Sequence, residues 1–301
     1  MELDHPLISE AQKGLRRRVL LFLKEAFKVQ RESNVVFVCG GNAATDMRSL
    51  FKVFAADHAP DYDIFQPEFA MENLFSSGFP EPFDITDFEA LIGSLSRAII
   101  IFPEAPGSFA ETGYFSAKED LCRRIILVLD SDRQRDDSFI SLGPAKKIGQ
   151  ASIFYPVIQM SYSNPKFDVV VERLKRVTLK KTLKQLRWNE LSELSDFELF
   201  CLVHEIVRVL TVATIEDLKF IFRGMSEGHL SVSKLHQIAS ILVGSKYLLE
   251  YGEFGHLRAN PDKGVLLDVS DGKVSEYNEI KLELANLYLD DPDFNALIGG
   301  L

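Results

Sequence analysis

Four strand-length runs separated by helical patterns constrain the fold of this chain more than any other feature of it. The runs are Asn34–Cys39, Asp61–Phe65, Ala98–Phe102 and Arg124–Leu129. The first of them is a continuous β-branched and aromatic run, which is typical of a strand buried on both faces of a parallel sheet. Helical patterns follow each of the first three runs. This alternation predicts a doubly wound parallel α/β sheet, in which ligands bind at the carboxyl ends of the strands.

The second half of the chain is mainly helical in pattern. Val169–Trp188 is predicted as one basic helix, and Lys246–Asn260 as a hairpin with Gly252 and Gly255 near its turn. Three helix-length segments lie between them: Asp196–Leu210, Thr214–Phe222 and Ser231–Leu242. Three helices and a hairpin favour a winged helix-turn-helix. We therefore predict an α/β domain over 1–165, a basic connecting helix over 166–190 and a smaller winged helix-turn-helix domain over 191–301.

Local signals mark the ends of several helices. The segment Glu10–Gln30 carries apolar residues at helical spacing and is predicted as one amphipathic helix. The candidate N-caps are Ser195 or Asp196, Thr214 and Ser231, because their side-chain oxygens can accept the free backbone N–H groups of a first turn.

Composition excludes several classes of protein. A net charge of −10 argues against a general polyanion binder, although a local basic patch remains compatible with it. Cys39, Cys122 and Cys201 are far apart, and the six histidines form no cluster, so we expect no metal and no cofactor. Glu2 and Asp4 stand where a secretion signal would be basic, and no apolar run approaches a membrane span of roughly 20 residues. We expect a cytoplasmic protein without a membrane partner.

The stretch from Phe102 to Tyr114 contains the candidate catalytic residues. A strand ends there, Pro106-Gly107-Ser108 makes a turn, and a helix begins whose free N–H groups can hold a phosphate or a ribose hydroxyl. Glu111 falls about one turn later, where its carboxylate can attack an anomeric carbon or stabilise an oxocarbenium-like transition state. Glu104 on the turn is a second catalytic candidate, which could orient sugar hydroxyls or assist proton transfer.

Other residues near strand ends are candidates for binding the substrate. Gly40 and Gly41 end the first run and could form a ligand loop or simply a tight turn, with Asn42 as ligand or cap. Glu68 follows the second run and could reach the same pocket. Glu89 is predicted to lie on a solvated helix face. Cys39 is interpreted as a small buried hydrophobe, because no histidine near it in sequence could activate a thiolate.

These motifs resemble those of a known family. One motif is similar to that of nucleoside deoxyribosyltransferase-like proteins, whose glutamate is the nucleophile: Pro106-Gly107-Ser108-x-x-Glu111-x-Gly113-Tyr114. A comparable turn is found in lysine-decarboxylase-like phosphoribohydrolases. The effector proteins of type II retrons resemble the chain more closely, since they join this domain to a winged helix-turn-helix. The segments that carry this resemblance are Phe37–Asn42, Asp63–Glu68, Phe102–Ser116 and Ser138–Pro144. One departure is Ala105, where the transferases usually have an aspartate.

The resemblance implies an N-glycosidase that hydrolyses a nucleotide, with NAD cleaved to nicotinamide and ADP-ribose, as a toxin in an abortive antiphage response. It also implies a partner reverse transcriptase with its multicopy single-stranded DNA, which restrains the enzyme until infection. A homo-oligomer or a filament formed with these partners is a further expectation. The base, the acceptor of the sugar and the trigger stay open.

A basic run without acidic residues suggests a contact with nucleic acid. Its cations are Arg173, Lys175, Arg176, Lys180, Lys181, Lys184 and Arg187. In an acidic protein such a run indicates a phosphate counter-charge, although charge runs are usually solvated faces. The third predicted helix offers only Lys234, His236 and Gln237 for base contacts, so the winged helix could instead bind a protein.

Two further functions remain alternatives. The first is a transcriptional regulator whose α/β domain senses a nucleotide without cleaving it. The second is a nucleoside deoxyribosyltransferase, which is disfavoured because those enzymes lack the basic helix and the C-terminal module.

Overall fold

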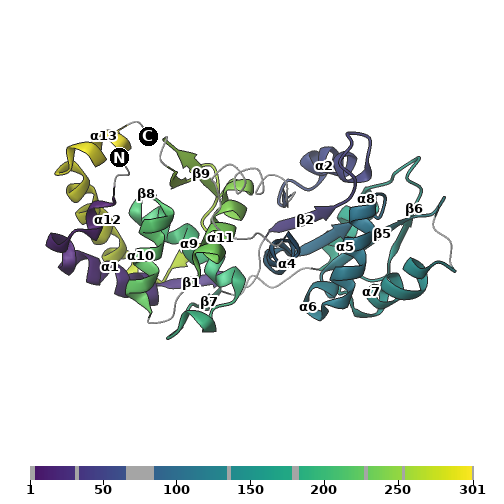
Figure 1. Ribbon diagram of the computed structural model, residues 1–301, viewed down its shortest axis with the longest axis horizontal. Helices are drawn as coiled ribbons and strands as arrows, with labels where there is room; N and C mark the ends of the chain where they lie inside the picture. The colour runs from purple at the N-terminus through teal and green to yellow at the C-terminus, as the bar shows by residue number, and fades with distance from the viewer. Residues whose placement is uncertain are drawn as a thin grey trace. The chain divides into compact units, whose positions relative to one another are not determined.

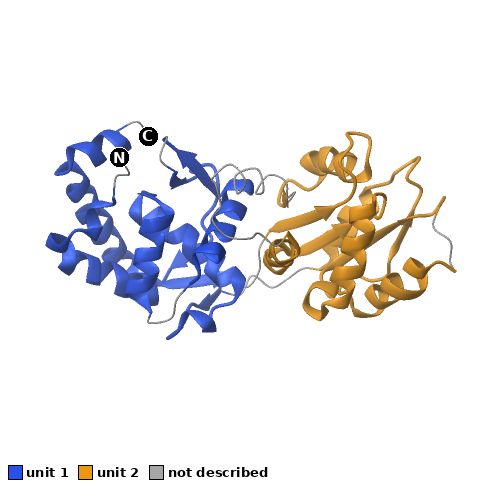
Figure 2. Cartoon of the chain, viewed as in Figure 1, with its two compact units in different colours: residues 1–31, 70–82, 181–301 blue, residues 32–69, 83–180 orange. Residues whose placement is uncertain are grey.

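The computed structural model describes residues 4–30, 34–65, 85–133, 137–177, 183–226, 230–252 and 255–299. The chain forms two compact units (Figure 2). Among the described residues, unit 1 contains 4–30 and everything from 183 onward, whereas unit 2 contains 34–65 and 85–177. The N-terminal segment, which sequence analysis grouped with the α/β domain, thus belongs to the unit formed by the C-terminal half.

Unit 2 is built on a five-stranded parallel sheet (Figure 1). Its strands are β2 (Val35–Cys39), β3 (Asp63–Phe65), β4 (Ala98–Ile101), β5 (Ile125–Asp130) and β6 (Ile158–Met160). Their order is β3-β2-β4-β5-β6. The predicted parallel sheet is confirmed over its four expected strands. Strand β6 was not predicted, because a strand of three residues is too short to show a recognisable pattern in the sequence.

Helices cover both faces of this sheet, as a doubly wound fold requires. They are α2 (Met47–His58), α4 (Ile85–Leu95), α5 (Pro106–Ala117), α6 (Glu119–Cys122), α7 (Lys146–Ala151) and α8 (Asp168–Arg176), with a π-helical turn over Ser141–Ala145. Val36 and Val38 share one buried cluster with Phe51 of α2 and Val170 of α8. Phe37 points to the opposite face, because side chains alternate along a strand, and its ring packs against Phe115 of α5.

Unit 1 begins with the N-terminal segment. Short 3₁₀ helices at Pro6–Ile8 and Glu10–Gln12 precede α1 (Lys13–Glu25) and β1 (Phe27–Gln30). The prediction of one helix over Glu10–Gln30 is wrong at its end: β1 pairs in antiparallel fashion with β11 (Leu267–Val269) and β7 (Leu183–Gln185). Phe27 and Val29 are buried on either side of Lys28, so the last four residues follow the two-residue period of a strand.

The predicted basic helix also ends earlier than expected. Helix α8 stops at Arg176, and residues 183–185 form β7. Leu186 and Trp188 are buried in unit 1. A basic helix over 166–190 is therefore wrong, because the strand pairing of β7 with β1 competes successfully with helical propensity.

The remaining elements of unit 1 form three helices with a small antiparallel sheet. They are α9 (Asp196–Leu210), β8 (Val212–Ala213), α10 (Ile215–Met225), α11 (Val232–Gly244), β9 (Leu248–Tyr251) and β10 (His256–Ala259). The strand order is β8-β10-β9. The predicted hairpin is confirmed, and Gly252 and Gly255 adopt positive φ angles of 67° and 70°, which glycine tolerates best. Ser195, Thr214 and Ser231 cap their helices as predicted.

Two C-terminal helices complete unit 1, α12 (Val274–Leu289) and α13 (Pro292–Ile298), with 3₁₀ turns at Leu191–Glu193 and Asp271–Lys273. The buried His5 ring lies within hydrogen-bonding distance of Leu210 O and Tyr288 Oη, and so ties the N-terminus to α9 and α12. None of the described helices is both long and apolar enough to cross a membrane.

Candidate active site

The order of the strands indicates where a ligand would bind in unit 2. Strand β2 is flanked by β3 on one side and by β4 on the other, so the chain reverses direction across the sheet at the β2/β4 boundary. In open α/β sheets ligands bind outside the carboxyl ends of the strands at such a switch point. Gly40 follows β2 there, and Glu104 follows β4. The fold thus brings together two motifs that are more than 60 residues apart in sequence.

Glu104 connects these motifs through its carboxylate. Oε1 accepts a hydrogen bond of 2.8 Å from Gly41 N, and Oε2 accepts one of 2.8 Å from Met47 N, the first residue of α2. A carboxylate at a helix N-terminus is favourable because it satisfies free N–H groups and faces the positive end of the helix dipole. The contacts give Glu104 a positioning role, while its predicted part in proton transfer stays a prediction.

The glycines of the loop are required by close packing. A Cβ atom at Gly40 would lie 2.7 Å from Arg48 Cβ and 2.8 Å from Glu104 Oε1, and one at Gly41 would overlap the Asp46 carboxylate. Neither glycine has a positive φ. Of the two explanations left open by the sequence, a tight approach of side chains to the loop therefore explains them better than a special turn conformation. Contact of this loop with a substrate stays a prediction.

Arg48 is a site residue that sequence reasoning missed. It is buried, and its guanidinium donates from Nε to Gly41 O at 3.1 Å and from Nη2 to Asn42 Oδ1. Asn42 is therefore held by Arg48 in this structure, and its predicted substrate contact is untested. No pattern in the sequence indicates that this arginine is buried, because an arginine near the start of a surface helix usually points to solvent.

The turn before α5 leaves its first residues open. Ser108 Oγ accepts the backbone N–H groups of Glu104 and Ala105 at 3.1 and 3.0 Å, so this buried hydroxyl caps the helix. Pro106 and Gly107 are exposed, and nothing lies within 4 Å of the position of a Cβ on Gly107. A phosphate or sugar could therefore approach the backbone at Gly107, whereas Ser108 is oriented towards the turn.

Glu111 lies in the second turn of α5 and is half-buried. Burial raises the pKa of the Cys39 thiol well above its usual value, and the neighbouring carboxylates of Glu111 and Glu89 raise it further. Glu111 also hydrogen-bonds to this thiol, so its carboxylate lies at the end of β2, directly before Gly40. Cys39 is buried, as the sequence predicts, and its raised pKa disfavours the thiolate, which is the nucleophilic form.

Glu89 is a second residue that the sequence misplaced. It was predicted to be solvated, but it is half-buried on α4 and its charge acts on Cys39. Tyr162 was also missed. Burial raises the pKa of its hydroxyl, and the charge of Glu104 raises it further, while its Oη donates to Val128 O at 2.7 Å. The carboxyl ends of the strands therefore gather more ionisable groups than the motif around Glu111 indicates.

The residues of the predicted basic run divide between the two units. Arg173 donates to Phe154 O and Pro156 O, and Lys175 to His58 O, within unit 2. Lys184 lies in unit 1, 3.6 Å from the Glu198 carboxylate. Arg176 is exposed. Arg173 and Lys175 thus donate to backbone carbonyls and Lys184 lies beside a carboxylate, while binding of the run to nucleic acid stays a prediction. Lys180, Lys181 and the candidate Glu68 lie outside the described residues.

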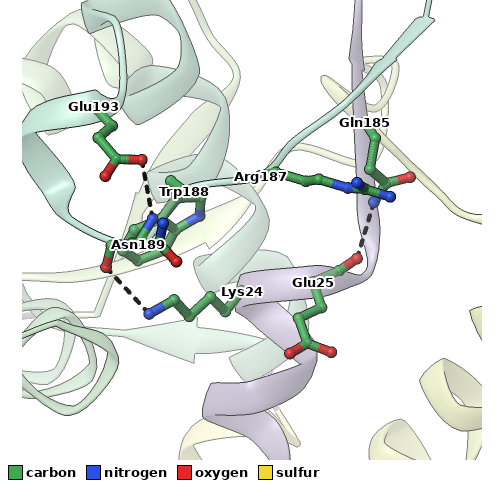
Figure 3. Close-up of a pocket in the computed structure, with 7 residues that line it drawn as sticks. All are labelled: Lys24, Glu25, Gln185, Arg187, Trp188, Asn189 and Glu193. Atoms are coloured by element: carbon green, nitrogen blue, oxygen red, sulfur yellow. Dashed lines mark hydrogen bonds between the residues drawn. The ribbon is translucent and has the colours of Figure 1, made fainter.

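Arg187 lines a pocket of about 500 Å³ in unit 1 (Figure 3). The lining residues are Lys24, Glu25, Gln185, Arg187, Trp188, Asn189 and Glu193. Lys24 Nζ lies 5.0 Å from the centre of the Trp188 ring and donates to Asn189 O at 3.2 Å. Two cations and two carboxylates line the pocket, so its charge does not single out a phosphate ligand. Nucleic-acid binding by Arg187 stays a prediction.

Comparison with known proteins identifies the family. Residues 44–250, more than half of the chain, match the family described as "STM3845 retron effector protein". The chain belongs to this retron effector family. Two Escherichia coli proteins are similar to parts of it. "Retron Ec86 putative ribosyltransferase/DNA-binding protein" is 34% identical over 113 residues, 37% of this chain and 36% of that protein. "Retron Ec73 putative ribosyltransferase/DNA-binding protein" is 30% identical over 135 residues, 42% and 43% of the two chains.

The two alignments each cover only part of this chain and part of the relative. The chain spans 36% and 43% of the lengths of the two relatives. The family match begins after the Gly40-Gly41 loop, includes Glu104 and Glu111, and continues through the three helices of unit 1 to β9. Parts of both units are therefore shared with the family.

Proposed function

We propose that this retron effector is an N-glycosidase that hydrolyses NAD to nicotinamide and ADP-ribose, with Glu111 as its catalytic carboxylate. One observation carries the proposal: Glu111 hydrogen-bonds to the residue that precedes the Gly40-Gly41 loop, at the switch point of a parallel sheet. A carboxylate beside a loop that can approach a ribose phosphate suits chemistry at an anomeric carbon. The relatives' names include ribosyltransferase, which is the same class of bond chemistry.

The proposed reaction needs one carboxylate and no general acid. The glycosidic nitrogen of NAD is a pyridinium, so nicotinamide departs as a neutral base when its bond to C1′ breaks. The positive charge then develops on the ribose, where the Glu111 carboxylate stabilises it or bonds to C1′. Water supplies the oxygen that replaces nicotinamide and releases one proton. Because both Glu104 oxygens accept backbone N–H groups, this residue suits holding the loop better than donating a proton.

We further propose that the helices α9, α10 and α11 with the sheet β8-β10-β9 form a winged helix-turn-helix. The helix-strand-helix-helix-hairpin order and the glycine turn at Gly252 and Gly255 support it. This module would hold the effector to a partner reverse transcriptase and its multicopy single-stranded DNA, in a complex or a filament. The names of both relatives include DNA-binding.

The experiment for the catalytic proposal compares two glutamate variants. Purified protein is incubated with NAD, with and without the reverse transcriptase and its DNA, and free nicotinamide is measured. We expect Glu111→Gln to lose at least about 10³-fold in rate, because the amide keeps the shape but removes the charge that stabilises the transition state. Glu119→Gln on α6 changes an exposed carboxylate and serves as the matched control, with the wild-type rate.

Full activity in Glu111→Gln would contradict the assignment of the catalytic residue. Intact NAD under every condition, together with DNA binding that depends on the nucleotide, would identify the α/β domain as a sensor in a regulator. Transfer of the sugar to an added nucleobase in place of water would identify a deoxyribosyltransferase-like enzyme.

A further inference from the structure

A second pocket of unit 1 gathers three cationic side chains from three separate elements. It encloses about 330 Å³ and lies where the end of α9, strand β10 and helix α12 meet. Its lining residues are Arg208, Thr211, Arg258, Ala259, Pro261 and Lys281. No carboxylate of a described residue is among them. We call it the cationic pocket.

Arg258 carries the most direct sign of a missing ligand. Its guanidinium carbon lies 5.1 Å from the centre of the Tyr251 ring, which holds one face of the group. Its Nε is buried but has no hydrogen-bond acceptor among the described residues. A buried N–H without an acceptor is costly, and a charged one more so. An anion in the pocket that Arg258 lines would compensate the charge of this guanidinium.

Arg208 forms an ion pair with Glu205 of the same helix. Its Nη1 lies 2.6 Å from Glu205 Oε2, and the Glu205 side chain is fully buried. Burial raises the pKa of Glu205 to about 7, although the charges of Arg208 and Lys281 oppose the shift. Burial therefore disfavours the charged form of the carboxyl that faces Arg208.

Lys281 caps the C-terminus of α9. Its Nζ donates to Arg208 O at 2.9 Å, to Val209 O at 3.1 Å and to Thr211 Oγ1 at 3.2 Å. Burial lowers the pKa of Lys281 to about 8, and the charge of Arg208 lowers it further. A helix C-terminus carries roughly half a negative charge. No described residue that lines the pocket carries a negative charge to balance the three cations.

Thr211 adds an observation that does not depend on charge. Its φ is 69° and its ψ is −53°, in a region that a β-branched residue rarely adopts. Strained backbone of this kind persists where the surrounding structure enforces it, and it clusters at ligand sites. The strained residue here lines the pocket and positions the hydroxyl that Lys281 contacts.

We propose that the cationic pocket binds a phosphate group, with Arg258 and Arg208 as the principal donors. Arginine presents a planar set of N–H donors that matches phosphate oxygens in pairs. The volume admits one or two phosphates and excludes a duplex. The phosphate belongs either to a small nucleotide or to the end of a nucleic-acid strand. This proposal lies in unit 1 and does not depend on NAD cleavage in unit 2.

The test uses pyrophosphate as the probe and the full-length chain. Calorimetric titration at pH 7 is expected to show a site that Arg258→Gln weakens about tenfold or more, as the loss of a charge-assisted hydrogen bond does. Arg258→Lys keeps the charge but not the paired geometry, and an intermediate loss is expected. Arg223→Gln, an exposed arginine on α10 outside the pocket, is the matched control. Melting temperatures show that each variant is folded.

Two further titrations separate the sources of the phosphate. ADP-ribose represents a small nucleotide, and single-stranded oligonucleotides with a 5′-phosphate or a 5′-hydroxyl represent a strand end. If Arg258→Gln weakens the binding of one of these probes, that probe represents the source of the phosphate. The proposal is overturned if no probe binds wild-type protein, or if every probe binds Arg258→Gln and Arg223→Gln equally well.

Discussion

Both oxygens of the Glu104 carboxylate accept backbone N–H groups, whereas the Glu111 carboxylate hydrogen-bonds to a buried thiol at the end of β2. Two glutamates only seven positions apart therefore have different environments. Glu104 joins the loop at Gly41 to the start of α2, which is a positioning role. In the proposed function, Glu111 lies beside the reacting sugar. The sequence suggested both as catalytic residues because it does not specify which backbone groups each side chain reaches.

A prediction separates these two roles. Glu104→Gln replaces one acceptor oxygen with an NH₂ group that faces a backbone N–H, so unit 2 should lose about 2 kcal/mol of stability. We expect a lower melting temperature and a raised KM for NAD, with kcat reduced less than about tenfold. Loss of kcat at an unchanged melting temperature would instead make Glu104 a catalytic residue.

At the scale of elements, helix α9 concentrates buried ionisable groups. Burial lowers the pKa of His204 to about 4, and it lowers that of His5, which contacts the end of the helix, also to about 4. Burial raises the pKa of Glu205 on the same helix to about 7. Stability from each neutral histidine is full above its ordinary pKa of 6.5 and is lost as pH falls towards 4. Stability from protonated Glu205 is full below 4.5 and is lost as pH rises towards 7.

The two histidines outweigh the single glutamate between pH 4.5 and 6.5. We predict that the free energy of unfolding of unit 1 increases by about 3 kcal/mol across this range, since one uncompensated proton remains. In His204→Leu the remaining histidine and Glu205 oppose each other, so the dependence should be nearly flat. Denaturant titrations at several pH values measure this, with His58→Asn in unit 2 as the control that keeps the slope. An unchanged slope in His204→Leu would contradict the assignment.

At the scale of the whole molecule, the chain combines an α/β unit with a mainly helical unit that also includes the N-terminal helix. In the proposed function unit 2, the α/β unit, is a nucleotide hydrolase, and restraint comes from partners. The residues of this proposal, Glu111, Gly40 and Gly107, all belong to unit 2.

This separation predicts toxicity in isolation. The chain expressed without its reverse transcriptase and DNA should deplete cellular NAD and stop growth, and Glu111→Gln should abolish both effects. Glu119→Gln, expressed at the same level, should remain toxic. Normal growth and normal NAD with soluble wild-type protein would contradict restraint by partners and would point to activation by them.

The sequence by itself determined the parallel sheet, the hairpin and the helix caps of unit 1. Each is a local pattern, such as the continuous β-branched run before Gly40, the glycines at 252 and 255, or a hydroxyl before a helix. The motif around Glu111 also lies within one turn and one helix, so spacing along the chain was enough to find it.

Only the tertiary structure decided how distant segments pair. Residues 27–30 and 183–185 continue helical patterns, yet they form strands because each finds a partner strand far away in sequence. Arg48, Glu89 and Tyr162 carry no motif, and the crossing of the chain at the β2/β4 boundary brings them to the ends of the strands. The cations of the basic run acquire internal partners in the same way. Burial and hydrogen bonding depend on three-dimensional neighbours, and no local pattern in the sequence encodes those.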